Sequence, residues 1–360
     1  MINGIDTSHH QIFNDYTQLN GTNNEFVFIK ASQELFEDPN FVQHSMGFAR
    51  TKLLRGAYHY LTFAKSGKDQ AECFLAAVRK SAVPMDLPPV LDVEDVKETL
   101  TPVQCETIIS DWLKVVRDSV KTMPIIYTGG WYWRDPLRLN NTENFKGYPL
   151  WTSRYPKDVS QGYMPLYGGW TKPTFWQYTE KGSVPGLSIK TPIIDLDFFL
   201  GDIDALWKLL PCPLSEVSKL PSARIEAMQF ALRAKGYSVN IDGSYASVQS
   251  AWNAWQTANG LSQQDSFTPK QWQALFDMTQ QTHPGNALMP ARPGTNVIPK
   301  SGAVDADMLN IRTGAAADKP VAALPLPKGK IVEILDEENG WYKVRTQVEG
   351  WVSKDFVKTH

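Results

Sequence analysis

The chain has 360 residues, of which 42% are hydrophobic and 21% charged, a composition typical of a globular protein with room for more than one domain. Its 36 lysines and arginines nearly balance 38 acids, which argues against nucleic acid as a partner. The three cysteines are widely spaced, so they form neither a disulfide framework nor a CxxC metal site, and we expect buried, reduced thiols.

The amino terminus shows no export signal. Met1 leads into Ile2-Asn3-Gly4-Ile5-Asp6 rather than into a basic segment followed by an apolar one. No apolar run reaches the roughly 20 residues that span a bilayer. We therefore expect a chain made in the cytoplasm, without a signal peptide or membrane span. A substrate outside the membrane then requires release by lysis or non-classical secretion.

Residues 1–212 alternate short apolar runs with longer helix-like stretches, the pattern of βα units. Eight candidate strands cover residues 2–6, 26–30, 54–60, 89–94, 123–127, 149–151, 174–178 and 192–195. Candidate helices cover residues 41–52, 68–80 and 105–119. Because the later connections are short, we predict an α/β fold, an irregular TIM-like barrel with fewer helices than strands.

Two further regions follow the barrel. Residues 213–282 contain three helical stretches at 223–235, 247–259 and 269–277, which predict a small all-α module. Residues 283–300 are dense in proline and glycine and predict a linker.

The last region, residues 301–360, has a different pattern. Period-two runs at 330–335 and 341–345 flank the turn Glu338-Asn339-Gly340. We interpret this region as a small all-β barrel.

Acidic side chains follow several of the predicted barrel strands. In an eight-stranded parallel barrel, catalytic groups gather where the strands end. Asp92 and Glu94 lie two apart on an apolar strand, so both project to one side. Asp6 and Asp195 come from the first and last strands, which are neighbours only if the sheet closes. Acids crowded in a partly dry cleft cannot all ionise, so at least one pKa rises and yields a general acid.

A protonated acid, ionised partners and many aromatic side chains suit glycoside hydrolysis. The aromatic candidates are Tyr58, Tyr60, Tyr127, Trp131, Trp151, Trp170, Trp176 and Tyr178. Packing in the core or rim is the alternative interpretation for about half of them. A helix cap or a surface ion pair is the alternative for any single acid. The histidines and cysteines offer no metal-ligand spacing, and we expect no metal or cofactor.

The barrel sequence resembles the family 25 glycoside hydrolases, the muramidases or lysozymes of phages, bacteria and fungi. The resemblance covers residues 1 to about 205. The motifs that carry it are Gly4-Ile5-Asp6-Thr7-Ser8, Gly56-Ala57-Tyr58-His59-Tyr60, Val90-Leu91-Asp92-Val93-Glu94, Ile126-Tyr127-Thr128, Leu150-Trp151-Thr152-Ser153-Arg154-Tyr155, Trp176-Gln177-Tyr178 and Ile194-Asp195-Leu196-Asp197.

This resemblance implies hydrolysis of the β-1,4 bond between N-acetylmuramic acid and N-acetylglucosamine. It implies that Glu94 donates the proton, that Asp92 orients the acetamido group or stabilises charge, and that Asp6 and Asp195 support them. The nucleophile is either an enzyme group or the substrate's own N-acetyl group. The expected substrate contacts are Tyr58, Tyr60, Tyr127, Trp151, Gln177 and Asp197. Asp197 stands where the family often has asparagine.

The two later regions resemble wall-binding modules. The motifs Ile241-Asp242-Gly243 and Trp272 to Leu275 are similar to the three-helix peptidoglycan-binding module. Gly340-Trp341-Tyr342-Lys343-Val344 and Gly350-Trp351-Val352 are similar to bacterial SH3-like domains, which bind wall stem peptide or cross-bridge. Such tethering raises the effective concentration of a monomeric enzyme on an insoluble wall.

Two competing functions stay open on the sequence alone: a chitinase-like hydrolase of N-acetylglucosamine polymers, and a wall-binding protein without activity. The sequence is equally compatible with a phage endolysin, an antimicrobial effector and a remodelling enzyme.

Overall fold

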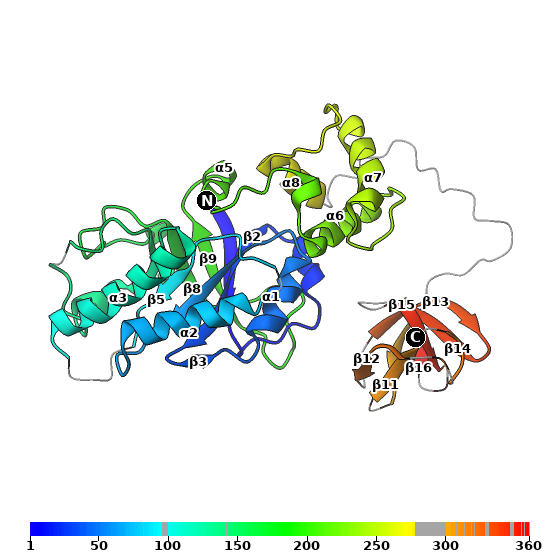
Figure 1. The fold of residues 1–360 in the computed structure, drawn as a ribbon, viewed down its shortest axis with the longest axis horizontal. Coiled ribbons are helices and arrows are strands. Elements are labelled where there is room, and N and C mark those ends of the chain that lie inside the picture. The colour runs from blue at the N-terminus through cyan, green and yellow to red at the C-terminus, as the bar shows by residue number, and fades with distance from the viewer. Residues whose placement is uncertain are drawn as a thin grey trace. The chain divides into compact units, whose positions relative to one another are not determined.

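The computed structural model describes residues 1–81, 83–95, 100–141, 143–277 and 300–359, the last range with gaps at 307, 313, 318, 320, 328–330, 346–348, 354 and 356. The chain divides into two compact units, Met1–Pro284 and Gly285–His360 (Figure 1). The linker expected at 283–300 lies outside the described residues except for Lys300, where a strand begins. No helix in the described ranges combines the length and apolarity needed to cross a membrane.

Each of the eight predicted barrel strands is present in the first unit. Their bounds are β1 Ile2–Thr7, β2 Asn24–Gln33, β4 Leu54–Tyr60, β5 Val90–Asp92, β6 Ile125–Gly129, β7 Leu150–Ser153, β8 Phe175–Gly182 and β9 Ile194–Phe199, with a two-residue β3 at Phe36–Glu37. β1 pairs with both β2 and β9, which closes the sheet.

The last strand departs from the predicted all-parallel arrangement. β9 is antiparallel to both of its neighbours, β1 and β8. The connection at 183–193 contains no helix, and a parallel return requires a long crossover that is usually helical. β9 therefore begins at the edge where the parallel strands end.

Helices cover the outside of the barrel mainly in its first half, as the sequence predicts. The longer ones are α1 Phe41–Ala49, α2 Gly67–Arg79 and α3 Pro102–Val120, and the short ones are η1 Tyr16–Gly21, α4 Gly130–Arg134, η2 Val159–Gln161 and α5 Ile203–Trp207. A capping box between Thr101 and Gln104 starts α3, and Lys121 ends it with φ of 58°. In the second half, long irregular connections with only the short α4 and η2 in their described residues replace the longer helices, so the expectation of short later connections is wrong.

Side chains at every second position along the strands fill the barrel interior. On β2, Phe26 and Phe28 belong to the interior core, whereas Val27 and Ile29 pack in the layer beneath the helices. A Cβ at Gly4 would lie 2.3 Å from the ring of Phe26, so only glycine admits this ring beside β1. Aromatic side chains thus fill the interior of the barrel below the carboxyl ends of its parallel strands. Polar groups occupy the carboxyl ends.

The predicted helices of the second region are α6 Ser222–Ala234, α7 Tyr245–Ala258 and α8 Pro269–Phe276, preceded by the short η3 Val217–Lys219. They share a core in which Trp252 and Trp255 stack, with ring centroids 5.0 Å apart. Stacked indoles supply much of the apolar area that a small bundle needs.

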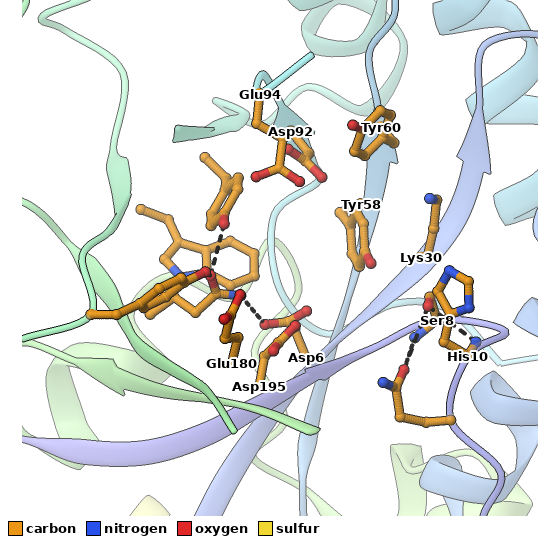
Figure 2. A pocket seen from close by; sticks show the side chains of 15 residues that line it. Asp6, Ser8, His10, Lys30, Tyr58, Tyr60, Asp92, Glu94, Glu180 and Asp195 are labelled. Atoms are coloured by element: carbon orange, nitrogen blue, oxygen red, sulfur yellow. Dashed lines mark hydrogen bonds between the residues drawn. The ribbon is translucent and has the colours of Figure 1, made fainter. Parts of the chain in front are cut away.

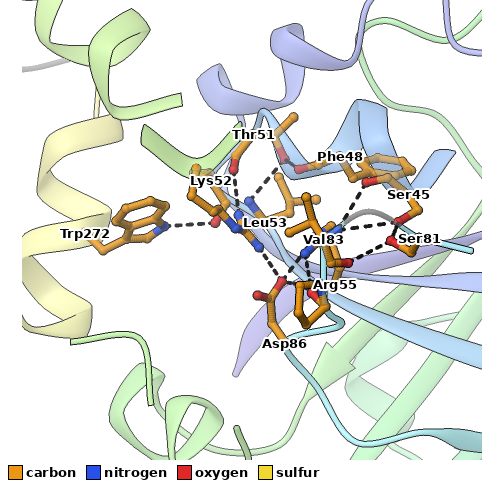
Figure 3. Close-up of polar contacts among 12 residues, drawn as sticks. Ser45, Phe48, Thr51, Lys52, Leu53, Arg55, Ser81, Val83, Asp86 and Trp272 are labelled. Carbon is orange, nitrogen blue, oxygen red and sulfur yellow. Dashed lines mark hydrogen bonds and ion pairs between the residues drawn. The ribbon is translucent and has the colours of Figure 1, made fainter. Parts of the chain in front are cut away.

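This helical module packs firmly against the barrel, and a buried ion-pair network joins them (Figure 3). Asp86 of the barrel accepts hydrogen bonds from Arg55 of β4 and from Arg224 of α6, and all three side chains are buried. Trp272 Nε1 of α8 also donates to the backbone carbonyl of Lys52 at 2.9 Å. The module is therefore fixed to the barrel rather than carried on a flexible tether.

The second unit is a small all-β domain, as predicted. Its strands are β10 Lys300–Val304, β11 Met308–Arg312, β12 Val321–Pro327, β13 Ile331–Glu338, β14 Trp341–Arg345, β15 Glu349–Ser353 and β16 Val357–Thr359. Val332, Val344 and Val352 are buried in its core. Asn339 and Gly340 both have positive φ, the geometry of a tight β-hairpin turn.

None of the three cysteines forms a disulfide, but the expectation of burial is only partly met. Cys105 is buried, Cys73 is half-buried and Cys212 is exposed. Cys212 lies between two prolines in the connection from the barrel to α6, where few side chains can cover it.

The buried network predicts a large effect of Asp86→Asn on stability. Removal of the carboxylate leaves Arg55 and Arg224 buried without a counter-charge, which costs about 3–5 kcal/mol of unfolding free energy. Glu226→Gln is the matched control, because it breaks the more exposed Arg50–Glu226 pair and should cost less than about 1 kcal/mol. Urea unfolding measures both, and equal losses would contradict a special role for Asp86.

Candidate active site

A cavity of about 330 Å³ opens at the carboxyl ends of the parallel strands (Figure 2). The four acids predicted to be catalytic line it: Asp6, Asp92, Glu94 and Asp195. Five of the six predicted substrate contacts line it too: Tyr58, Tyr60, Tyr127, Trp151 and Gln177. The structure therefore brings together side chains from β1, β4, β5, β6, β7, β8 and β9.

Strand pairing explains how the acids meet. Asp6 lies opposite Asp195 in the register of β1 with β9. Because β9 is antiparallel, Asp195 stands at the start of its strand and still reaches the same edge of the sheet as Asp6. Asp92 is the last residue of β5, and Glu94 follows two positions later and faces the same cavity.

A hydrogen-bond network joins the two sides of the cavity. Gln177 Nε2 donates to Asp6 Oδ2 at 2.6 Å. The hydroxyls of Tyr127 and Tyr155 both donate to Gln177 Oε1, at 2.7 and 2.5 Å. The Tyr127 hydroxyl also lies close enough to Glu94 to affect the pKa of this carboxyl group. Gln177 and the two tyrosines thus connect Asp6 to the wall beside Glu94.

Desolvation changes the proton affinity of these acids. Burial, with the nearby charges of Asp195 and Asp197, raises the pKa of Asp6 well above its ordinary value. Burial also raises the pKa of Asp92 well above its ordinary value, and Glu94 adds to this effect. The pKa of Asp195 rises to about 6, mainly through burial. The cavity therefore holds fewer negative charges than carboxyl groups.

Glu94 differs from the other acids in its accessibility. Its side chain is exposed at the open side of the cavity, yet protein atoms surround it closely enough for desolvation to raise its pKa. The nearby hydroxyl of Tyr127 opposes this rise in pKa. A group that solvent and substrate can reach, and that keeps its proton more readily than an ordinary glutamate, is suited to general acid catalysis.

Asp197 is the predicted substrate contact that does not line the cavity. It is fully buried, two residues further along β9 than Asp195 and therefore one layer deeper in the barrel. Its Oδ1 accepts a hydrogen bond from Trp151 Nε1 at 2.9 Å, and its carboxyl group lies close enough to Asp6 for each to affect the pKa of the other. Asp197 supports two cavity residues from below.

Several lining residues were not among the predicted site residues: Ser8, His10, Gln11, Lys30, Tyr155 and Glu180. Lys30 follows Phe26 and Phe28 at period two on β2, and this spacing is the signal that could have identified it. Tyr155 lies just beyond β7, at the end of the motif that begins at Leu150.

His59 has a structural position despite its location in a motif. It is fully buried, with ring nitrogens 2.8 Å from Ser32 Oγ and 3.2 Å from Gln70 Oε1. Burial lowers its pKa to about 3, so the ring is neutral. Within the ranges that the structure describes, no group of three or more histidine, cysteine or acidic residues could hold a metal ion.

Comparison with known families agrees with this geometry. The family model for glycosyl hydrolases family 25 matches residues 5–187. The chain belongs to glycosyl hydrolase family 25. A model for the bacterial SH3 domain matches residues 307–358. This family 25 protein is therefore a glycoside hydrolase that carries a bacterial SH3 domain.

Similar proteins match a little more than half of this chain. The uncharacterized protein YegX of Escherichia coli K12 is 34% identical over 215 residues, which cover 57% of this chain and 72% of YegX. Lysozyme M1 of Streptomyces globisporus is 29% identical over 195 residues, 52% of this chain and 65% of that protein. The bacterial lysozyme from Streptomyces coelicolor, whose structure is solved, is 24% identical in sequence to this chain. The two structures match with a TM-score of 0.51 over 58% of this chain and 97% of the lysozyme, which supports the fold.

The raised pKa of Asp195 predicts a pH-dependent stability of the family 25 barrel. The folded state holds this proton more tightly than the unfolded state, whose pKa is 3.8. The contribution of Asp195 is therefore fully present below about pH 4 and is lost as the pH rises through about 6.

Denaturation of the native chain and of Asp195→Asn across pH 3.5–7 measures this contribution. The native-minus-variant difference in unfolding free energy should fall as the pH rises through this window. A difference that stays constant would mean that Asp195 titrates normally.

Proposed function

We propose that the barrel hydrolyses the β-1,4 linkage between N-acetylmuramic acid and N-acetylglucosamine in peptidoglycan. The observation that carries this proposal is the meeting of Asp6, Asp92, Glu94 and Asp195 in one cavity, where desolvation raises the pKa of each. Membership of family 25 and the similarity to a protein named lysozyme support it.

Glu94 is the proton donor in this mechanism. Its accessible carboxyl group protonates the glycosidic oxygen as the bond to the leaving sugar breaks. Asp92 orients the acetamido group of the substrate or stabilises the positive charge that develops on the ring. Proton donation by Glu94 is required whether the nucleophile is an enzyme group or the substrate's own N-acetyl group.

The remaining acids and the aromatic side chains form the walls. Asp6 is fixed by Gln177, and Asp195 lies opposite it in register, so the one that is ionised supplies negative potential near the developing charge. Tyr58, Tyr127 and Trp151 are almost fully buried. Their rigid edges limit how a sugar ring can enter.

The later regions supply attachment to the wall. We assign the barrel to residues 1–212, the helical module to 213–282, the linker to 283–300 and the SH3 domain to 301–360. The SH3 domain binds stem peptide or cross-bridge, and the protein acts as a monomer after lysis or non-classical secretion. The match to the bacterial SH3 domain model supports this assignment.

Replacement of Glu94 by glutamine tests the proton donor. The amide keeps the size of the side chain and cannot donate the proton, so wall lysis should slow by about 10²- to 10⁴-fold. Glu72→Gln on the exposed face of α2 is the control and should leave lysis unchanged. Turbidity of purified sacculi measures both rates, and an undiminished rate in Glu94→Gln would remove this residue from the mechanism.

Product analysis separates the muramidase from its two rivals. Mass spectrometry of products should find muramic acid at the new reducing ends. New ends that carry N-acetylglucosamine would favour the chitinase-like alternative. Binding to sacculi without any released reducing sugar would favour an inactive wall-binding protein.

Removal of residues 285–360 tests attachment by the second unit. The first unit, Met1–Pro284, keeps the complete cavity, so its kcat/KM on soluble glycan should be unchanged. Lysis of insoluble sacculi should fall by about tenfold or more, because the tether no longer raises the local concentration. Equal activity of the long and short chains on sacculi would contradict a tethering role.

A further inference from the structure

Lys30 enters the cavity from the end of β2. It shares the inward face of this strand with Phe26 and Phe28, so its side chain begins where the aromatic interior ends. Only 8% of the residue is exposed. Figure 2 shows it on the side of the cavity where Tyr58, Tyr60 and His10 lie.

The ammonium group of Lys30 has two neutral neighbours at close range and lies within electrostatic range of Asp92, Asp38 and Glu94. Nζ donates a hydrogen bond to Gln33 Oε1 at 2.7 Å and lies 4.5 Å from the centroid of the Tyr60 ring. An ammonium has three donors, and these contacts within the described part of the chain leave it able to bind a further acceptor. That acceptor can come from a molecule in the cavity.

The charge of Lys30 is unusual for this cavity. Among the lining residues that the structure describes, it is the one lysine or arginine beside five acids. The only lining histidine is His10, whose pKa is lowered, first by burial and then by His9 and Lys30. A polymer of N-acetylglucosamine is neutral and carries no group that requires a buried ammonium.

We propose that Lys30 is a specificity-determining residue that binds a carboxylate carried on the O3 side chain of the muramyl sugar. The inference rests on the proposed function, because only the muramyl unit has this side chain. The carboxylate has two possible sources: the lactyl group of strands without stem peptide, or the first free carboxylate of the stem peptide. A charge-assisted hydrogen bond at this position distinguishes the muramyl unit from the otherwise similar N-acetylglucosamine.

A purely electrostatic role makes a different prediction. The positive charge of Lys30 partly offsets the rise in the pKa of Asp92 and of Glu94 that burial causes. If this were its whole role, loss of the charge would slow cleavage of every glycan by the same factor and would shift the pH profile. The substrate preference would then stay as it is in the native enzyme.

The test compares three soluble glycans with the full chain and two variants. The glycans are peptide-free strands, peptide-bearing strands, and peptide-free strands whose lactyl carboxylate is converted to a neutral methylamide. Lys30→Met removes the charge that lies over the Tyr60 ring and keeps a side chain of similar length, whereas Lys30→Arg keeps the charge. The readout is the ratio of kcat/KM values on charged and neutral strands.

The native chain should prefer a charged strand over the methylamide by about ten- to a hundredfold. Lys30→Met should reduce this preference to about twofold or less, and Lys30→Arg should retain most of it. Preference for peptide-free strands identifies the lactyl carboxylate, and preference for peptide-bearing strands identifies the stem peptide. Either result supports the proposal.

Two results would overturn it: equal slowing of all three glycans by Lys30→Met, or no preference of the native chain for charge. The second needs no variant, so it remains decisive even if Lys30→Met fails to fold. A native chain that cleaves none of the glycans refutes the proposed function itself, and this outcome is visible before any variant is made.

Discussion

The pairing of β1 with both β2 and β9 is the constraint on which the site depends. It closes the sheet and sets Asp6 opposite Asp195, although the two residues belong to the first and last strands of the barrel. An open sheet would leave them on opposite edges. The antiparallel direction of β9 is essential to this arrangement, because it puts the beginning of the last strand at the edge where the parallel strands end.

Closure also determines the environment of the acids. Inward-facing side chains such as Phe26 and Phe28 fill the lower barrel, and the next inward positions on the strands carry polar groups. The carboxyl groups of Asp6 and Asp92 are therefore buried away from bulk water. Desolvation and mutual repulsion raise their pKa values. The same packing that stabilises the barrel thus produces carboxyl groups that keep their protons more readily than ordinary ones.

Local sequence pattern, together with the resemblance to family 25, predicted the strands, the helices and most of the residues that line the cavity. Period-two alternation located the strands, and the spacing of Asp92 and Glu94 put both on one side. The features that the sequence did not reveal depend on pairing between distant segments. The direction of β9 determines that Asp197 lies beneath the cavity, and the contact of Arg224 with Asp86 fixes the helical module to the barrel. Lys30 was missed although its period-two position was visible.

The closed barrel keeps at least one cavity carboxyl protonated at a pH where an ordinary one is ionised. Carbon-13 NMR titration of the Asp and Glu carboxyl groups measures this directly, with Glu94→Gln and Asp195→Asn used for assignment. The account predicts that the Glu94 signal titrates above the ordinary value of about 4.3, and that the Asp195 signal titrates near 6. If every carboxyl in the cavity titrates close to 4, the account is contradicted.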